Sequence, residues 1–159
     1  MQSYLKDGLI EKSVYSKPGS KTQDKEVYRL SKAGRELCRR ELSLSVYNAQ
    51  NPAHDLALAD RYFALSQTER ETWRTESQSR DDVCARIHQL HEQGEEERAG
   101  ELWGKLQEQQ LSMPDAVYTR DDGITVGFEV ITGNYGDAEI AAKEETADIL
   151  GIELEYQKT

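Results

Sequence analysis

The chain has 159 residues, 36% of them hydrophobic, and a formal net charge of −10 at pH 7. This length suits one ordinary domain, or a small module joined to a compact one. No apolar run approaches the ~20 residues of a membrane-spanning helix, and charges interrupt the first residues where a signal peptide needs an apolar centre. Cys38 and Cys84 lack the spacing of a zinc site or a disulfide framework. We therefore expect a cytoplasmic protein with no membrane partner.

The charge is unevenly distributed along the chain. Residues 1–40 carry ten Lys and Arg against five Asp and Glu, whereas residues 41–159 carry ten against twenty-five. Phosphate backbones attract a basic segment and are repelled by an acidic one. The pattern favours a nucleic-acid partner for the basic segment; the alternative is that both segments are simply solvated surfaces.

The first 46 residues predict a small α and β unit. Turn and capping signals favour a helix ending at Gly8, a strand over 9–15, a polar hairpin tip KPGSKTQDK, a strand over 27–30 and a helix from Lys32 to about Val46. Ser31 is the expected N-cap of that last helix.

This order resembles the second half of a winged helix-turn-helix domain, with "YLKDGLIEK" entering the wing and "VYRLSKAGREL" leaving it. The resemblance implies a truncated winged helix over residues 1–47 that binds double-stranded DNA. Such a half domain needs a partner surface, which favours a homodimer. The alternative is a plain hairpin and helix without a role on DNA. The DNA-binding candidates are Lys12, Lys17, Lys21, Lys25, Arg29, Lys32, Arg35, Arg39 and Arg40.

The remainder of the chain predicts a second α/β domain over residues 52–159, after a linker near Asn48 to Pro52. The expected elements are a helix opening at Pro52, a strand over 72–76, a helical insert over about 81–111 that Gly94 or Gly100 interrupts, strands over 116–118 and 124–131, a helix over 137–150 and a strand over 152–156. The expected class is therefore mixed α+β or α/β.

Without the insert, the second domain has the αβββαβ order of restriction-endonuclease-like proteins, and it resembles the PD-(D/E)xK nuclease superfamily. The resemblance implies a Mg²⁺ or Mn²⁺ site at Asp115 and Glu129, because hard cations bind carboxylate oxygens and activate water for attack on a phosphodiester. Glu76 is a third acidic candidate. The motif lysine belongs two residues after Glu129, but Ile131 stands there; Lys143, on the next helix, is the candidate replacement.

Each acidic candidate has a structural alternative. Asp115 follows a proline and can simply begin a turn. Glu129 can point to solvent at a sheet edge, although burying it would cost several kcal/mol without a partner. His54 can cap its helix or form a hydrogen bond within the core instead of touching phosphate.

A narrower resemblance covers most of the chain. The segments "PAHDLALADRYFAL", "WRTE", "PDAVYT" and "FEVITGNYG" followed by "EIAAK" are similar to the replication-relaxation family of mobile-element proteins. This resemblance implies a role in the maintenance, mobilisation or replication of a plasmid, transposon or phage-type element. It also suggests that a winged helix is coupled to a nuclease-like domain.

Three functions are compatible with these signals. Because Ile131 cannot act as the motif lysine, we expect a DNA-binding accessory protein without required cofactors, whose inactive nuclease-like domain serves for docking or dimerisation. The first alternative is an anti-defence inhibitor that offers a DNA-like acidic surface to a host or element-encoded protein. The second is an active Mg²⁺- or Mn²⁺-dependent nuclease that uses Lys143.

Overall fold

The computed structural model describes residues 2–16, 24–43, 51–133 and 135–159, which form seven helices and two sheets of a mixed α and β protein. Two compact units are present: an N-terminal unit, Met1–Pro52, and a C-terminal unit, Ala53–Thr159. Within the described residues, no helix is both long and apolar enough to cross a bilayer.

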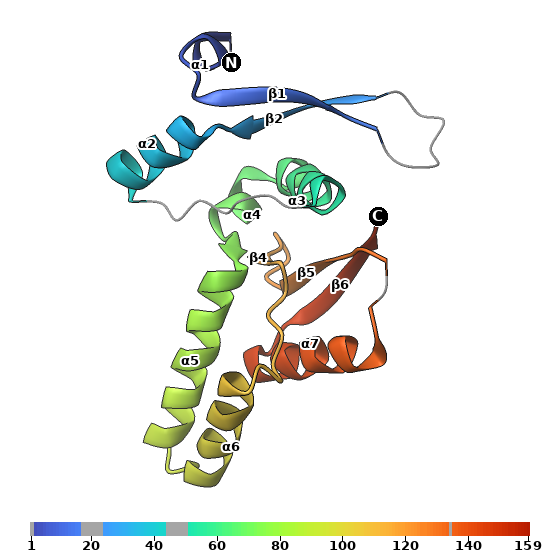
Figure 1. Ribbon diagram of the computed structural model, residues 1–159. Coiled ribbons are helices and arrows are strands. Elements are labelled where there is room, and N and C mark those ends of the chain that lie inside the picture. The colour runs from blue at the N-terminus through green and yellow to red at the C-terminus, as the bar shows by residue number, and fades with distance from the viewer. Residues whose placement is uncertain (1, 17–23, 44–50, 134) are drawn as a thin grey trace. The chain divides into compact units, whose positions relative to one another are not determined.

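The N-terminal unit consists of an antiparallel hairpin with a helix at each end (Figure 1). Its elements are α1 (Gln2–Lys6), β1 (Ile10–Tyr15), β2 (Lys25–Leu30) and α2 (Lys32–Leu42). Ser31 caps α2 as expected, since its hydroxyl accepts a hydrogen bond from Gly34 N, and it donates to Gly8 O at 2.6 Å. Ser31 therefore ties the start of α2 to the turn before β1. The expected hairpin tip, with Lys17 and Lys21, lies outside the described residues.

No apolar side chain is buried among the described residues of the N-terminal unit, where the buried residues are Ser31 and Gly34. Large apolar side chains such as Tyr4, Val14 and Leu42 are exposed instead. Because buried apolar area is the main driving force of folding, this unit has little hydrophobic stabilisation within its described residues.

The C-terminal unit contains a four-stranded sheet in the order β3-β4-β5-β6. The elements are α3 (Pro52–Ala64), α4 (Gln67–Glu71), β3 (Arg74–Thr75), α5 (Glu76–Glu92), α6 (Glu96–Gln107), β4 (Ala116–Thr119), β5 (Thr125–Ile131), α7 (Asp137–Leu150) and β6 (Glu153–Lys158). Strands β3, β4 and β5 are antiparallel, and β6 runs parallel to β5 after the crossover through α7.

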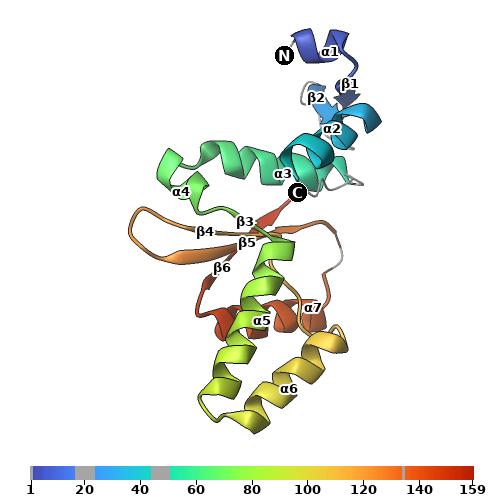
Figure 2. The same cartoon turned by 90° about the vertical axis from the view of Figure 1, so that its left-hand side faces the viewer.

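The sheet lies between α3 on one face and α7 on the other (Figures 1 and 2). Val126, Phe128 and Val130 of β5 form one core cluster with Ala57 of α3. A second cluster joins α5, α6 and the segment before β4 with the end of α7. Side chains alternate along a strand, so Glu129 lies on the opposite face of β5 from the α3 cluster.

The structure differs from the expected elements in four places. Helix α2 ends at Leu42 with Ser43 as its C-cap, short of the expected Val46. The helical insert is two helices: Gly94 separates them with φ +83°, which favours glycine, whereas Gly100 lies inside α6. Strand β3 covers only two residues, so Glu76 begins α5 instead of ending a strand. Residues 67–71, where no element was expected, form α4, whose Ser66 and Glu69 make a capping box.

Candidate functional site

The strand register brings Asp115 and Glu129 together. Ala116 pairs with Phe128 across β4 and β5, so Asp115, immediately before β4, stands opposite Glu129. Two hydrogen bonds from backbone N–H groups to the carboxylates stabilise this arrangement. Asp115 N donates to Glu129 Oε2 at 3.1 Å, and Val130 N donates to Asp115 Oδ2 at 2.9 Å. The two acidic residues predicted as a pair therefore form one cluster at the end of the sheet.

Glu129 is completely buried within β5, and its carboxylate has partners on both oxygens. Lys143 Nζ lies 2.9 Å from Oε2, and the Tyr135 hydroxyl donates to Oε1. The solvent-facing alternative for Glu129 is therefore wrong. A buried carboxylate without such partners would be strongly destabilising.

Lys143 reaches the site from the middle of α7, where it is only 5% exposed. Its ammonium group also donates to Met113 O at 2.9 Å, just before the segment that carries Asp115. The positive charge that Ile131 cannot supply is thus present beside Glu129, delivered by the helix that follows β5.

His54 and Asp55, in the first turn of α3, extend the cluster. His54 Nε2 lies 2.9 Å from Asp115 Oδ2, and His54 Nδ1 lies 3.5 Å from Asp55 Oδ1. Asp55 Oδ2 is buried and has no hydrogen-bond partner among the described residues. From the sequence, His54 was expected in a capping or core role or near phosphate, and no role was predicted for Asp55. Their adjacency in the first turn of a helix opened by Pro52 was the available signal.

Burial and hydrogen bonding shift two pKa values in the site. Burial raises the pKa of the Glu129 carboxyl, while the hydrogen bonds from Tyr135 and Lys143 act against that rise. Burial, followed by the hydrogen bond to Glu129, raises the pKa of Tyr135 well above its usual range. The Tyr135 hydroxyl therefore keeps its proton at neutral pH and acts as a donor.

The residues present fit a divalent cation with an incomplete protein shell. Among the described residues, no group of three or more His, Cys, Asp or Glu side chains is arranged to hold a metal ion. Mg²⁺, however, usually binds through one or two carboxylates and keeps several waters. Asp115 and Glu129 supply two carboxylates of this kind, joined by the hydrogen bond from Asp115 N to Glu129 Oε2.

Glu76, the first residue of α5, forms no hydrogen bond or ion pair with this cluster within the described residues. The pairing of β3 with β4 ends at Thr75 and Ala116, one residue before Glu76. The chain has already turned into α5 at this point, and Glu76 is exposed. Three of the four predicted catalytic residues are therefore together in the structure: Asp115, Glu129 and Lys143.

The basic candidates of the N-terminal unit have varied surroundings. Lys12 pairs with Glu26 at 2.5 Å, Arg29 with Glu11 at 3.0 Å, and Arg40 with Glu41 at 2.7 Å. The Arg35 guanidinium donates to Leu30 O. The remaining described candidates, Lys25, Lys32 and Arg39, are exposed. Acidic neighbours thus offset part of the positive charge of the hairpin.

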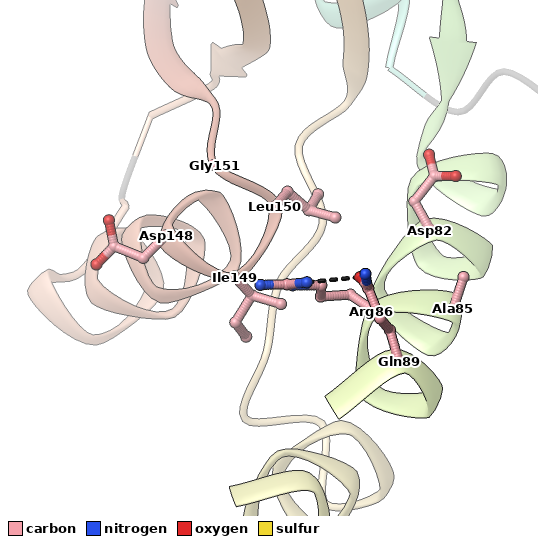
Figure 3. Close-up of a pocket in the computed structure, with 8 residues that line it drawn as sticks. All are labelled: Asp82, Ala85, Arg86, Gln89, Asp148, Ile149, Leu150 and Gly151. Carbon is pink, nitrogen blue, oxygen red and sulfur yellow. Dashed lines mark hydrogen bonds between the residues drawn. The ribbon is translucent and has the colours of Figure 1, made fainter. Parts of the chain in front are cut away.

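A separate hollow of about 580 Å³ lies between α5 and the end of α7 (Figure 3). Its lining is Asp82, Ala85, Arg86, Gln89, Asp148, Ile149, Leu150 and Gly151. Two of its charged groups already have partners, because Asp82 bonds Arg74 and Arg86 bonds Gln89. The lining includes none of the residues of the cluster around Asp115 and Glu129.

Compared with protein-family models, curated proteins and solved structures, the chain has no significant match. Any functional assignment therefore rests on the geometry of the site and on the sequence motifs.

Proposed function

We propose that the C-terminal unit is a restriction-endonuclease-like nuclease unit that cleaves DNA with a divalent cation, and that Lys143 replaces the lysine missing at position 131. The observation that carries the proposal is the 2.9 Å contact between Lys143 Nζ and Glu129 Oε2. From Ile131 alone we expected a silent site, but a cation on α7 beside Glu129 supports the active alternative better.

Each residue of the cluster has a defined part in this proposal. Asp115 and Glu129 would hold Mg²⁺ or Mn²⁺, which when bound would activate water and stabilise charge on the phosphate. Lys143 would hold a fixed positive charge in a site shielded from water, where such a charge stabilises developing anionic oxygens strongly. His54 would fix the orientation of Asp115 through their 2.9 Å contact.

The N-terminal unit is proposed as the part that holds the substrate. What supports this role is the balance of ten basic against five acidic residues over residues 1–40, together with the hairpin-and-helix order of a partial winged helix. A basic unit of this kind would bring duplex DNA to an otherwise acidic chain. The link to a mobile element rests on the sequence resemblance alone.

Cleavage of supercoiled plasmid in the presence of Mn²⁺ tests the proposal. Wild-type protein should nick the plasmid, and Asp115→Asn should abolish nicking. Lys143→Gln, which keeps a donor but loses the charge, should reduce the rate by about 10²–10³-fold. Lys105→Gln is the matched control, since Lys105 pairs with Glu145 at 2.6 Å away from the cluster.

Two results would contradict the proposal. One is an intact plasmid with wild-type protein at all Mn²⁺ concentrations, which would return the chain to the binding-only function. The other is nicking that survives Asp115→Asn, which would assign the activity to a contaminant. Circular dichroism of each variant confirms that the fold is retained.

A further inference from the structure

The two oxygens of the Glu129 carboxylate are not equivalent. Oε2 accepts hydrogen bonds from Lys143 Nζ and from Asp115 N, at 2.9 and 3.1 Å. Oε1 accepts from the hydroxyl of Tyr135. A carboxylate oxygen offers about two acceptor directions, so Oε2 is already saturated. A cation that binds Glu129 therefore approaches Oε1, where the Tyr135 hydroxyl takes one of the two acceptor directions.

We infer that Tyr135 is a removable cap on the metal-binding oxygen of Glu129: its hydroxyl holds one of the two acceptor positions on Oε1 in the ion-free protein, and the divalent cation takes that position by displacing it. This inference rests on the proposed function, since it concerns the same site. It assigns Tyr135 as a positioning residue that the sequence patterns did not identify.

The surroundings explain why Tyr135, and not Lys143, is the group that leaves. Lys143 is buried and holds a second bond to Met113 O, so its ammonium group is fixed from two sides. Tyr135 is only half-buried and lies between the end of β5 and the start of α7. Its side chain can move towards solvent while the Lys143–Glu129 contact stays intact.

Charge separation favours the same position. Lys143 contacts Oε2, so a cation at Oε1 lies on the far side of the carboxylate from the ammonium group. Like charges repel more strongly at shorter distance and in a less polar environment. Binding at Oε1 therefore keeps both positive charges on Glu129 with the least repulsion between them.

The test measures Mn²⁺ binding by electron paramagnetic resonance, which counts free ions, with wild-type protein and Tyr135→Phe. Removing a hydrogen bond to a carboxylate that the cation must otherwise break should tighten Mn²⁺ binding by about tenfold. Tyr118→Phe is the matched control, because its hydroxyl bonds Glu155 at 3.4 Å on the same sheet. That control should leave Mn²⁺ affinity unchanged.

A second measurement detects the displacement directly. Displacing the Tyr135 hydroxyl changes the surroundings of its ring, so adding Mg²⁺ to wild-type protein should produce a difference spectrum in the tyrosine band. Mg²⁺ itself absorbs no light and does not obscure this signal. This spectrum should be absent in Tyr135→Phe and retained in Tyr118→Phe.

The outcomes separate this inference from the proposed function. Equal or weaker Mn²⁺ binding by Tyr135→Phe, with binding by wild type, overturns the cap and leaves the nuclease proposal standing. No Mn²⁺ binding by either protein overturns both. Tighter binding by Tyr135→Phe that Asp115→Asn abolishes in the double variant supports both.

Discussion

The two units use lysine–glutamate pairs in contrasting ways. In the N-terminal unit, Lys12 and Glu26 meet at 2.5 Å with side chains 43% and 57% exposed. In the C-terminal unit, Lys143 and Glu129 meet at 2.9 Å with side chains 6% and 0% exposed. Solvent screens the first pair, so removing either residue changes the stability little. The second pair is confined to a buried site, where each partner depends on the other.

The same contrast holds for the apolar side chains. The C-terminal unit has two buried clusters, whereas the described residues of the N-terminal unit bury no apolar side chain. A buried carboxylate and ammonium group can be retained only where surrounding packing fixes their geometry. Position in a core, and not residue type, therefore turns such a pair into a candidate site.

The largest expected effect comes from breaking the buried pair. Lys143→Met leaves Glu129 without its cation and should reduce the stability of the C-terminal unit by about 3–5 kcal/mol. Both tryptophans belong to this unit, so urea unfolding followed by tryptophan fluorescence reports on it. Lys12→Met is the matched change in the N-terminal unit and should give the wild-type curve. Equal curves for the two variants would contradict the contrast.

A second expectation concerns backbone packing at glycines. A Cβ on Gly34 would lie 2.0 Å from Leu9 O, so Gly34→Ala should cost about 1–3 kcal/mol by overpacking. Faster hydrogen exchange at the Ser31 amide, which bonds Leu9 O, would report this destabilisation. Unchanged exchange in Gly34→Ala would contradict the close approach.

Gly100 has open space around it within α6, so Gly100→Ala should stabilise the protein by about 0.5–1 kcal/mol.

The third expectation separates the units by DNA binding. Replacing Lys32 and Arg39 together by alanine should lower the slope of log affinity against log salt by about 0.9 for each phosphate that the protein no longer neutralises. Replacing Arg80 and Lys158, exposed basic residues of the C-terminal unit, should change the slope less. Fluorescence anisotropy of a labelled duplex at several salt concentrations measures both. Equal slopes for the two double variants would contradict the role of the N-terminal unit.

The smallest expectation concerns two exposed carboxyls. The hydrogen bond from Lys12 lowers the pKa of Glu26, and the backbone hydrogen bond from Ile124, followed by Arg120, lowers the pKa of Asp122. A lowered folded pKa gives stability that is present above the unfolded pKa and lost as pH falls through the folded one. The β1–β2 and β4–β5 hairpins should therefore lose stability as the pH falls.

Salt should distinguish these two carboxyls, because it screens exposed charge pairs. Added salt should raise the pKa of Glu26 more than that of Asp122, whose first partner is a backbone N–H. Carboxyl chemical shifts followed across a pH titration, at low and high salt, measure the difference. The same salt shift at both residues would show that the two carboxyls have the same kind of partner.

Local signals in the sequence were enough for most elements of the C-terminal unit. The helix stop at Gly151 and the tight turn at Gly123 are glycines with positive φ, and strand β5 was visible as an apolar run. Helix α4 was missed although its capping residues, Ser66 and Glu69, are spaced as a capping box. Glu76 was misplaced because the strand before it ends after two residues, which local patterns do not resolve.

The site was only partly predictable for a physical reason. Asp115 and Glu129 follow from strand order, because adjacent antiparallel strands place opposite residues on one face. Lys143 could be named from the sequence, but whether an α7 side chain points at β5 depends on how the helix packs. Tyr135 lay beyond sequence reasoning, since its contact with Glu129 depends on how the segment before α7 folds back on β5.

The most direct test of the account is to move the lysine. Position 131 lies two residues after Glu129 on β5, so both side chains point to the same face. If Lys143 acts as the missing motif lysine, Mn²⁺-dependent plasmid nicking should fall about 10²–10³-fold in Lys143→Gln. Nicking should then return in part when Ile131→Lys is added. Nicking at the wild-type rate in folded Lys143→Gln, or a folded double variant without any recovery, would contradict this role of Lys143.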